Sequence, residues 1–347
     1  MNLKNRIKSI TPPNVWRALQ RQKANRCLAS YYLLQRKQYI NYCAGPWNEK
    51  QRNGQYERLR STIVYYIHRI EKGLSHRYFR SGFGKSAFAH LNELMQTWQH
   101  EGYPTDDVVF CAAENVIRAY VRKHHEIGKP IPDFINAWFA DEITQSGEQT
   151  KSYARINAGT KVVRAIDKRN NASLDYESLF RNRTSVREYA DTPVDMESVR
   201  EAINISMKTP SVCNRQAFRI LLIRNPNLIE KSLAVQGGWR GYAAPPLLAL
   251  ISVDIRSFVS VEERNEPYID GGLFTMSFLT ALEYESIAAC PLNTMFRDEQ
   301  EREIRKLLAV PEHEVLIAFI AIGNFPDVIN SPMSFRYSGD MITREID

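Results

Sequence analysis

Three nearly continuous apolar runs in the C-terminal half constrain the fold of this chain more than any other feature. They occupy residues 218–223, 247–253 and 315–322. Such continuity is typical of strands that are buried on both faces of a sheet. Apolar residues at helical spacing predict helices at 195–207, with Asp195 as the N-cap, at 272–285 and at 299–308. Alternating strands and helices indicate an α/β or α+β domain of about 170 residues that begins near residue 173.

The N-terminal half has a different pattern. Apolar residues recur at spacings of three and four over 61–70, 87–98 and 108–125, so most of 61–145 is predicted to be helical. Residues 146–172 are rich in Ser, Gln, Thr, Lys and Asn, which predicts a linker. We therefore expect three parts: a basic helical segment at 1–60, a helical extension with its linker at 61–172, and the ligand-binding domain at 173–347.

Positive charge is concentrated at the N-terminus. Residues 1–60 contain thirteen Lys and Arg but two acidic residues, so they carry +11 in a chain whose net charge is +7. The helix predicted at 14–42 mixes these bases with aromatic and aliphatic side chains, as helices on lipid headgroup surfaces do. Two interpretations stay open: contact with an anionic membrane surface, and packing on the acidic remainder of the chain's own dimer. We find no helix-turn-helix, zinc ligand set or RNP-type motif and expect no nucleic-acid partner.

The cysteines and the apolar stretches favour a cytoplasmic location. The five cysteines are scattered without a C-x-x-C pair, which fits reduced thiols better than a disulfide framework or a metal site. The longest apolar stretches, 242–253 and 315–322, are shorter than the roughly 18 residues of a transmembrane helix. The basic N-terminus is not followed by the apolar core of a signal peptide. We expect a cytoplasmic protein that is peripheral to the membrane if residues 1–60 bind lipid.

The first candidate site is the segment Arg183-Thr184-Ser185-Val186-Arg187. Two guanidinium groups four residues apart, with a hydroxyl between them, suit a phosphate or another polyoxygenated anion. Arginine donates bidentate hydrogen bonds, and serine a short neutral one. A solvated helix terminus has the same composition, so the segment alone does not establish a site.

A second candidate lies in the loop 209–218, between a predicted helix and a predicted strand. Pro210 ends the helix, and Ser211, Asn214 and Gln216 offer several neutral donors and acceptors. Such groups suit a heteroaromatic ring or a polyol chain. By itself, the loop is equally an ordinary polar connection.

Two further segments combine small residues with apolar elements. Asp270-Gly271-Gly272 opens the helix predicted at 272–285, and residues 286–294 read Ser-Ile-Ala-Ala-Cys-Pro-Leu-Asn-Thr. Small side chains allow the backbone to approach a neighbour closely. Residues 322–326 read Ile-Gly-Asn-Phe-Pro and end a buried strand, and Arg336 follows near the C-terminus.

The order and spacing of these four segments resemble the nitroreductase family of flavin enzymes. The resemblance rests on R-x-S-x-R with P-V close behind, P-S-x-x-N-x-Q-x-F, D-x-G before a helix, and I-G-x-x-P followed by a terminal Arg, over residues 177–337. It implies a nitroreductase-like α+β fold, with a central, mainly antiparallel sheet flanked by helices, here preceded by a mostly helical N-terminal region. It also implies FMN as cofactor, NADH or NADPH as electron donor, and an intertwined homodimer with two flavins at its interface. The chain contains neither G-x-G-x-x-G after a strand nor G-x-x-x-x-G-K-[ST], which agrees with FMN rather than a dinucleotide site.

Carried over position by position, the resemblance implies twelve cofactor-binding residues. Four would hold the FMN phosphate, ribityl chain and pyrimidine edge: Arg183, Thr184, Ser185 and Arg187. Arg336 would add a second cation at the phosphate. Three would reach FMN from the partner subunit: Pro210, Ser211 and Asn214. Four would lie along the flavin ring, with a backbone N–H near its N5: Pro291, Leu292, Asn293 and Thr294. No side chain is expected to be a catalytic acid or base, because the flavin carries the chemistry.

The chain departs from the family pattern at several positions. Ser334 stands where a basic residue is common, and Thr294 and Ser286 stand where glycine is common. Gln216-Ala217-Phe218 replaces a frequent Gln-Pro-Trp. These departures put the FMN affinity and the redox tuning in question.

One more pattern lies in the extension, at residues 68–75, which read His-Arg-Ile-Glu-Lys-Gly-Leu-Ser. His68 and Glu71 share one helical face. Either His68 is an ordinary packed residue and Gly73 caps the helix, or this face is a polar patch that docks onto the flavin domain or its substrate. The pattern is similar to a nitroreductase subgroup with long N-terminal extensions, often encoded among bacterial capsule or exopolysaccharide genes.

These observations predict an FMN-dependent oxidoreductase. Hydride would pass from NAD(P)H through flavin N5 to an unidentified small-molecule acceptor in ping-pong order, with a link to envelope polysaccharide biosynthesis. The alternative is a degenerate flavin fold that serves as a scaffold or binding module in a polysaccharide-assembly complex.

Overall fold

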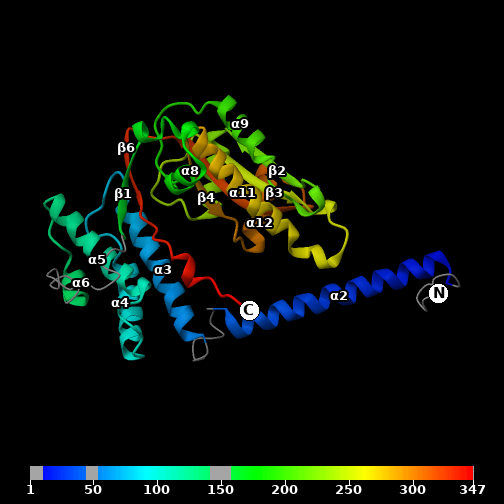
Figure 1. Ribbon diagram of the computed structural model, residues 1–347, viewed down its shortest axis with the longest axis horizontal. Helices are drawn as coiled ribbons and strands as arrows, with labels where there is room; N and C mark the ends of the chain where they lie inside the picture. Colours follow the sequence, from blue (N-terminus) through cyan, green and yellow to red (C-terminus); the bar gives the residue numbers. More distant parts are fainter. Residues whose placement is uncertain (1–10, 44–53, 141–157, 347) are drawn as a thin grey trace.

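The computed structural model describes residues 11–43, 54–140 and 158–346 (Figure 1). Parts of the basic segment and of the predicted linker fall on residues 1–10, 44–53 and 141–157, which lie outside the described residues.

Three helices of the N-terminal half share a hydrophobic core. They are α3 (Gln55–Leu74), α4 (Lys85–His100) and α5 (Val108–Glu126), and they confirm the three helices predicted in this region. On α3 the buried apolar side chains recur at helical spacing: Leu59, Ile63, Ile67, Ile70 and Leu74. They pack with the fully buried Trp98 and Tyr120 and with the short helix α6 (Asp133–Trp138).

Helix α2 (Pro13–Tyr42) extends away from the rest of the chain toward the N-terminus (Figure 1). None of its side chains is buried. Tyr31 contacts the turn η6 (Val261–Asn265), where the Arg264 guanidinium lies 3.9 Å from the tyrosine ring centroid. The helix predicted at 14–42 is therefore confirmed, and both interpretations of its basic surface stay open. In the part of the chain that the structure describes, no helix is long and apolar enough to span a membrane.

A four-stranded antiparallel sheet forms the centre of the C-terminal half and confirms the α+β class. Its order is β2 (Phe218–Ile223), β3 (Leu247–Asp254), β5 (Glu314–Asn324) and β4 (Ile287–Asn293). β3 is buried at every residue. The prediction of burial on both faces is wrong for β2, because β2 is an edge strand that exposes Arg219 and Leu221. β4 was not predicted, since small residues and Pro291 weaken the strand pattern, and an edge position tolerates the proline.

Helices cover both faces of this sheet, because alternate residues of a strand point to opposite faces. On one face, α9 (Met196–Ser206) and α11 (Glu266–Tyr284) pack on Ala249 and Ile251 of β3. On the other face, α10 (Pro226–Gln236) and α12 (Asp298–Leu308) pack on Leu248 and Leu250. The predicted helices at 195–207, 272–285 and 299–308 are confirmed as α9, α11 and α12, and the Asp195 carboxylate accepts the capping hydrogen bonds of α9.

Asp270-Gly271-Gly272 lies inside α11, which begins at Glu266, so these residues do not open the helix. Gly271 nevertheless has the predicted role. A Cβ at this position would lie 2.6 Å from Cγ1 of Ile317, so the missing side chain lets the helix approach β5.

A separate two-stranded ribbon joins the two halves of the chain. β1 (Thr160–Arg164) pairs antiparallel with β6 (Val328–Pro332). Residues 158–172 therefore contain this strand and two short 3-10 turns, which differs from the linker that their polar composition predicted. The partner strand lies far along the chain, and local composition carries no sign of it. The division of the chain into three parts remains a prediction.

The C-terminal end of α3 docks on the C-terminal half through polar contacts. Lys72 Nζ donates to the Gly238 carbonyl at 3.0 Å, and the Tyr242 hydroxyl donates to the Lys72 carbonyl at 3.0 Å. Of the two interpretations of residues 68–75, the contacts of Lys72 agree with a polar patch that docks on the C-terminal half. Gly73 as a helix cap is wrong, because α3 continues to Leu74. A Cβ on Gly73 would lie 2.0 Å from the Phe83 ring, so the glycine permits a close approach.

Candidate functional site

The segment from Arg183 to Arg187 lies along β4 in an extended conformation. It follows α8 (Tyr176–Asn182), and Ser185 forms an isolated parallel bridge with Ala289 of β4. Alternate side chains of an extended segment point to opposite sides. Thr184 and Val186 are buried, whereas Arg183, Ser185 and Arg187 are half-buried. The two guanidinium groups and the hydroxyl therefore share one side of the segment. Arg183 is the C-cap residue of α8, but it is half-buried and the residues after it leave the helix, so a solvated helix terminus describes only the start of the segment.

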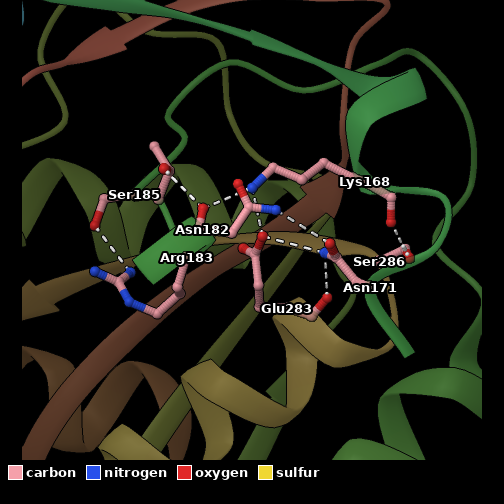
Figure 2. A network of polar contacts seen from close by, with 8 residues as sticks. Lys168, Asn171, Asn182, Arg183, Ser185, Glu283 and Ser286 are labelled. Atoms are coloured by element: carbon pink, nitrogen blue, oxygen red, sulfur yellow. Dashed lines mark hydrogen bonds and ion pairs between the residues drawn. The ribbon is translucent and has the colours of Figure 1, made fainter. Parts of the chain in front are cut away.

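A buried polar network fixes the turn that leads into this segment (Figure 2). Lys168 forms an ion pair with Glu283 at 2.6 Å and donates to the Asn182 carbonyl at 2.7 Å. The Asn171 amide donates to the carbonyl and the carboxylate of Glu283. Ser286 donates to the Lys168 carbonyl at 2.6 Å from a backbone with φ 59°, a conformation that favours glycine. The network is fully paired, so it positions Arg183 and has no spare charge for a ligand.

Four cations converge beside β4 without an ion-pair partner among the described residues, although the charge of Glu283 acts on Lys161 and Arg183 from further away. Arg183, Arg187, Arg336 and Lys161 form no ion pair with any residue of the described ranges. Burial lowers the pKa of Arg183, and nearby Arg336 lowers it further while Glu283 opposes the shift. Burial also lowers the pKa of Lys161, with Lys168, Arg183 and Arg336 acting in the same direction. Mutual repulsion of this kind is relieved when an anion binds.

Helix α3 brings His68 to the same cluster. Burial, assisted by the charges of Arg187, Lys72 and Arg336, lowers the pKa of His68 to about 4. The imidazole is therefore neutral at pH 7, and it lies among cations that come from three separate segments of the chain. Among the described residues, no three His, Cys, Asp or Glu side chains gather as metal ligands would.

Glu71, one turn after His68, ties α3 to the ribbon. Its two carboxylate oxygens accept hydrogen bonds from the Gly159 N–H at 3.0 Å and the Ser334 N–H at 3.2 Å, at the ends of β1 and β6. Burial raises the pKa of Glu71 to about 7, since it outweighs these two donors and the nearby Arg336 and Arg187. The carboxyl group is therefore partly protonated near neutral pH.

This pKa predicts a pH-dependent stability. Between pH 4.5 and 7 the folded state holds a proton on Glu71 that the unfolded chain has lost, so the stability from this group is complete below pH 4.5 and is lost as the pH rises through 7. From pH 6 to pH 8 the free energy of unfolding of the wild type should fall by about 1 kcal/mol relative to Glu71→Gln, which has no titrating group. Denaturant titrations of both proteins at the two pH values measure this difference. A constant difference would show that Glu71 titrates outside this range.

Ser211 and Asn214 lie in a loop next to β2, the edge strand opposite β4, whereas Pro210 at the start of this loop lines a groove with Phe180 of α8. Their loop precedes β2, and β3 and β5 separate β2 from β4, a distance of about 14 Å at the usual strand spacing. The loop is held firmly, because the Val212 N–H donates to the Asp270 carboxylate at 3.1 Å and the Gln216 N–H donates to Ser211 Oγ at 3.0 Å. Within one chain, the structure does not bring these residues to the cation cluster.

The residues expected along the flavin ring form the end of β4 and the turn after it. Pro291, Leu292 and Asn293 belong to the strand, and Thr294 Oγ1 donates to the Ile317 carbonyl at 3.0 Å. Cys290, immediately before them, is buried. Burial raises the pKa of its thiol, while Arg187, Lys72 and Arg183 oppose the shift. The cation cluster therefore borders the strand that would lie under the ring.

The departures from the family pattern have structural roles here. The Thr294 hydroxyl donates a hydrogen bond to the backbone of β5, and the backbone N–H of Ser334 donates one to the Glu71 carboxylate. Ala217 is buried, and Phe218 stacks on Phe274 with ring centroids 4.6 Å apart. None of the four removes a member of the cation cluster.

Sequence reasoning missed Lys161 and the Lys168–Glu283 pair. Both lysines lie in the polar segment predicted as a linker, and no local signal distinguishes them from solvated lysines. Lys72 was part of the pattern at 68–75, but its proximity to Arg187 depends on how α3 docks.

Comparisons with known proteins show similarity in the C-terminal half. Residues 180–236, which include the Arg183–Arg187 segment and the loop before β2, match the model of the nitroreductase family. A protein of Archaeoglobus fulgidus, described as a candidate NADH dehydrogenase/NAD(P)H nitroreductase, is 24% identical over 164 residues, which cover 47% of this chain and 93% of that protein. A similarly described protein of Streptomyces coelicolor is 32% identical over 78 residues, or 22% of this chain and 40% of that protein. Residues 180–236 of the C-terminal half are therefore similar in sequence to the nitroreductase family.

Solved structures of similar proteins cover about half of the chain. One, described as a candidate NADH dehydrogenase/NAD(P)H nitroreductase from Parabacteroides distasonis, has 20% identity and a TM-score of 0.43, and the match covers 48% of this chain and 96% of that one. Another, described as a candidate NAD(P)H:FMN oxidoreductase from Staphylococcus epidermidis, has 18% identity and a TM-score of 0.44, with coverages of 50% and 96%.

Proposed function

We propose that this protein is an FMN-dependent oxidoreductase that uses NADH or NADPH as electron donor. The observation that supports this most is the cation cluster of Arg183, Arg187, Arg336 and Lys161, which lies beside β4 in the nitroreductase-like half of the chain and forms no ion pair among the described residues. When bound, FMN supplies the electron chemistry by accepting hydride from the nicotinamide and passing it to a second substrate. The acceptor is a small molecule, for which we propose a link to envelope polysaccharide biosynthesis.

The donor set fits FMN. Arg183 and Arg336 supply two guanidinium groups for a phosphate dianion, and Ser185, whose Oγ lies 3.5 Å from the Arg183 guanidinium, supplies a hydroxyl on the same side. Arg187 would hold the pyrimidine edge. The backbone from Pro291 to Thr294 would lie along the ring, where an N–H aimed at N5 favours negative charge on the reduced cofactor. These roles require no catalytic acid or base from the chain.

We also propose that the site is completed in a homodimer. The loop with Ser211 and Asn214 leads into β2, across the sheet from β4, so we propose that a partner subunit brings these residues, together with Pro210, to FMN. The surface next to Pro210 is suited to this. An open groove of about 780 Å³ between α8, α9 and α11 is lined by Phe180, Ile205 and Met276, and Ile269 and Leu273 of α11 are also exposed. Exposed apolar surface of this extent is typical of a subunit interface.

Flavin content and nicotinamide reduction test the proposed function. The purified protein should be yellow and release about one FMN per chain on denaturation. Under anaerobic conditions, NADH or NADPH should bleach the bound flavin, and a suitable acceptor should restore its colour. Colourless protein that also refuses added FMN would overturn the proposal.

The second candidate function is a flavin-fold scaffold or binding module. It is favoured by Thr294, whose hydroxyl donates to the backbone of β5 at a position where glycine is common. FMN that stays bound but is bleached by neither NADH nor NADPH would support it.

For the basic helix α2 we propose peripheral contact with an anionic membrane surface, since bases and exposed Leu19 and Leu33 share one helix. Failure to sediment with anionic vesicles would exclude this contact.

A further inference from the structure

We propose that helix α3 of the N-terminal extension forms a wall of the FMN site, and that Lys72 and His68 hold the cofactor together with Arg187 and Arg336. This inference rests on the proposed function and deepens it. It assigns cofactor-binding residues to a part of the chain that lies outside the matched family segment at 180–236.

The first argument is how α3 is fixed to the segment that carries Arg336. Glu71 accepts the Ser334 N–H at 3.2 Å, and Arg336 lies two residues further on. The Arg336 side chain then turns back to donate to the carbonyls of Ser334 and Phe335. His68 precedes Glu71 by three residues and lies on the same face of α3. The part-buried hydrogen bond between Glu71 and Ser334 therefore holds His68 of α3 near Arg336.

The second argument is the path from Lys72 to β4. Lys72 Nζ donates to the Gly238 carbonyl at 3.0 Å. In the same turn, the Gly238 N–H donates to Gln236 Oε1 at 2.8 Å, and Gln236 Nε2 donates to the Asn293 carbonyl at 3.2 Å. Three hydrogen bonds, through Gly238 and Gln236, thus connect the lysine to the end of β4, where the flavin ring is expected.

The third argument is the balance of charge. Lys72 is half-buried, and among the described residues its ammonium group, with three donors, has one acceptor, the Gly238 carbonyl. Glu71 is the nearest acid on α3, but both of its oxygens bind backbone N–H groups. Burial and the charge of Arg187 lower the pKa of Lys72, while the Cys290 thiol acts in the opposite direction. Half-buried cations without a counter-charge are costly unless an anion joins them. FMN offers two suitable regions, its phosphate and its pyrimidine edge.

The proposed roles follow from these neighbours. Lys72, close to Arg187 and Cys290, would bind at the pyrimidine edge, where a cation stabilises the added negative charge of the reduced ring. His68, close to both Arg187 and Arg336, would donate a hydrogen bond between the ring and the phosphate. The extension would then act on the affinity and on the reduction potential of the cofactor.

Full-length variants test this wall with FMN itself as the probe. Lys72→Met keeps the length of the side chain and removes its charge, and it should weaken FMN binding about tenfold and shift the midpoint potential of the bound flavin to a more negative value. His68→Phe keeps a ring of similar size and should weaken binding several-fold. Lys85→Met is the matched control. Lys85 is exposed on the first turn of α4, so its loss should change neither quantity.

The readouts separate this inference from the proposed function. Fluorescence quenching gives the FMN dissociation constant, redox titration gives the potential, and thermal unfolding shows whether each variant is folded. If Lys72→Met does not fold, His68→Phe and Lys72→Arg replace it in the test. His68→Phe should still weaken FMN binding several-fold, whereas Lys72→Arg, which keeps the positive charge, should retain most of the affinity. Wild-type protein that binds no FMN would overturn the proposed function and this inference together. Wild-type protein that binds FMN, with Lys72→Met and His68→Phe unchanged in affinity and potential, would overturn the α3 wall alone.

Discussion

Replacing both Arg183 and Arg336 with methionine is expected to lower the affinity for FMN by about a thousandfold. A charge-assisted hydrogen bond contributes about 1.5–3 kcal/mol, and the double variant removes at least two of them at the phosphate. Arg183 and Arg336 come from opposite ends of the nitroreductase-like domain. Neither forms an ion pair among the described residues, and Glu283, the acidic residue near Arg183, is already paired with Lys168, so the substitution leaves no carboxylate without a partner. The fold should therefore survive, and flavin titration followed by fluorescence measures the loss.

Arg181→Met is the matched control for this experiment. Arg181 lies two residues before Arg183, is 77% exposed at its side chain, and pairs with Glu177 at 2.8 Å on the solvent side of α8. An exposed pair of this kind contributes little to stability. FMN affinity should be unchanged in this variant. If Arg181→Met and the double variant lost affinity equally, the effect would come from net charge and not from the site.

Two variants that each fail to bind FMN should together restore part of the binding if they are co-expressed. One is Arg183→Met with Arg336→Met, and the other is Ser211→Ala with Asn214→Ala. Because the loop before β2 lies across the sheet from β4, each site would combine arginines of one chain with the loop of its partner. A mixed dimer would then contain one intact site and one doubly damaged site. Random pairing should return about one quarter of the sites to wild-type affinity.

The control is to mix the same two proteins after separate purification, under conditions without subunit exchange. That mixture should bind no more FMN than the two variants measured separately. If the co-expressed sample behaves in the same way, the loop serves the site of its own chain, and the proposed dimer arrangement is wrong.

Much of the fold could be predicted because its central elements carry strong local patterns. β3 and β5 are continuous apolar runs, and α3 repeats Leu59, Ile63 and Ile67 at one helical face. β4 lacked such a pattern, since Ala288, Ala289, Cys290 and Pro291 are weak strand formers, and its place is set by pairing with β5. The β1–β6 ribbon is short and partly polar. Its two strands are more than 150 residues apart in the sequence, and local sequence patterns do not predict a pairing over such a separation.

The candidate site likewise has one part that a local sequence motif predicts and another part that only tertiary contacts bring together. Arg183, Ser185 and Arg187 form a local motif whose alternation could be interpreted directly, and the structure places all three on one side of the segment. Lys161 and Lys72 join them through tertiary contacts. The β1–β6 pairing places Lys161, and the contact with Gly238 places Lys72. The spacing of residues along the sequence does not predict which side chains join a site through tertiary contacts between distant elements.

The measurement that tests the account most directly compares FMN with riboflavin, which has the same ring and ribityl chain but no phosphate. Wild-type protein freed of flavin is titrated with each compound, and the two dissociation constants are compared at the same salt concentration. If Arg183 and Arg336 form a phosphate site beside β4, FMN should bind at least about a hundredfold more tightly than riboflavin. Equal affinities for the two flavins, or no binding of either, would contradict the central claim that this cation cluster is the cofactor site.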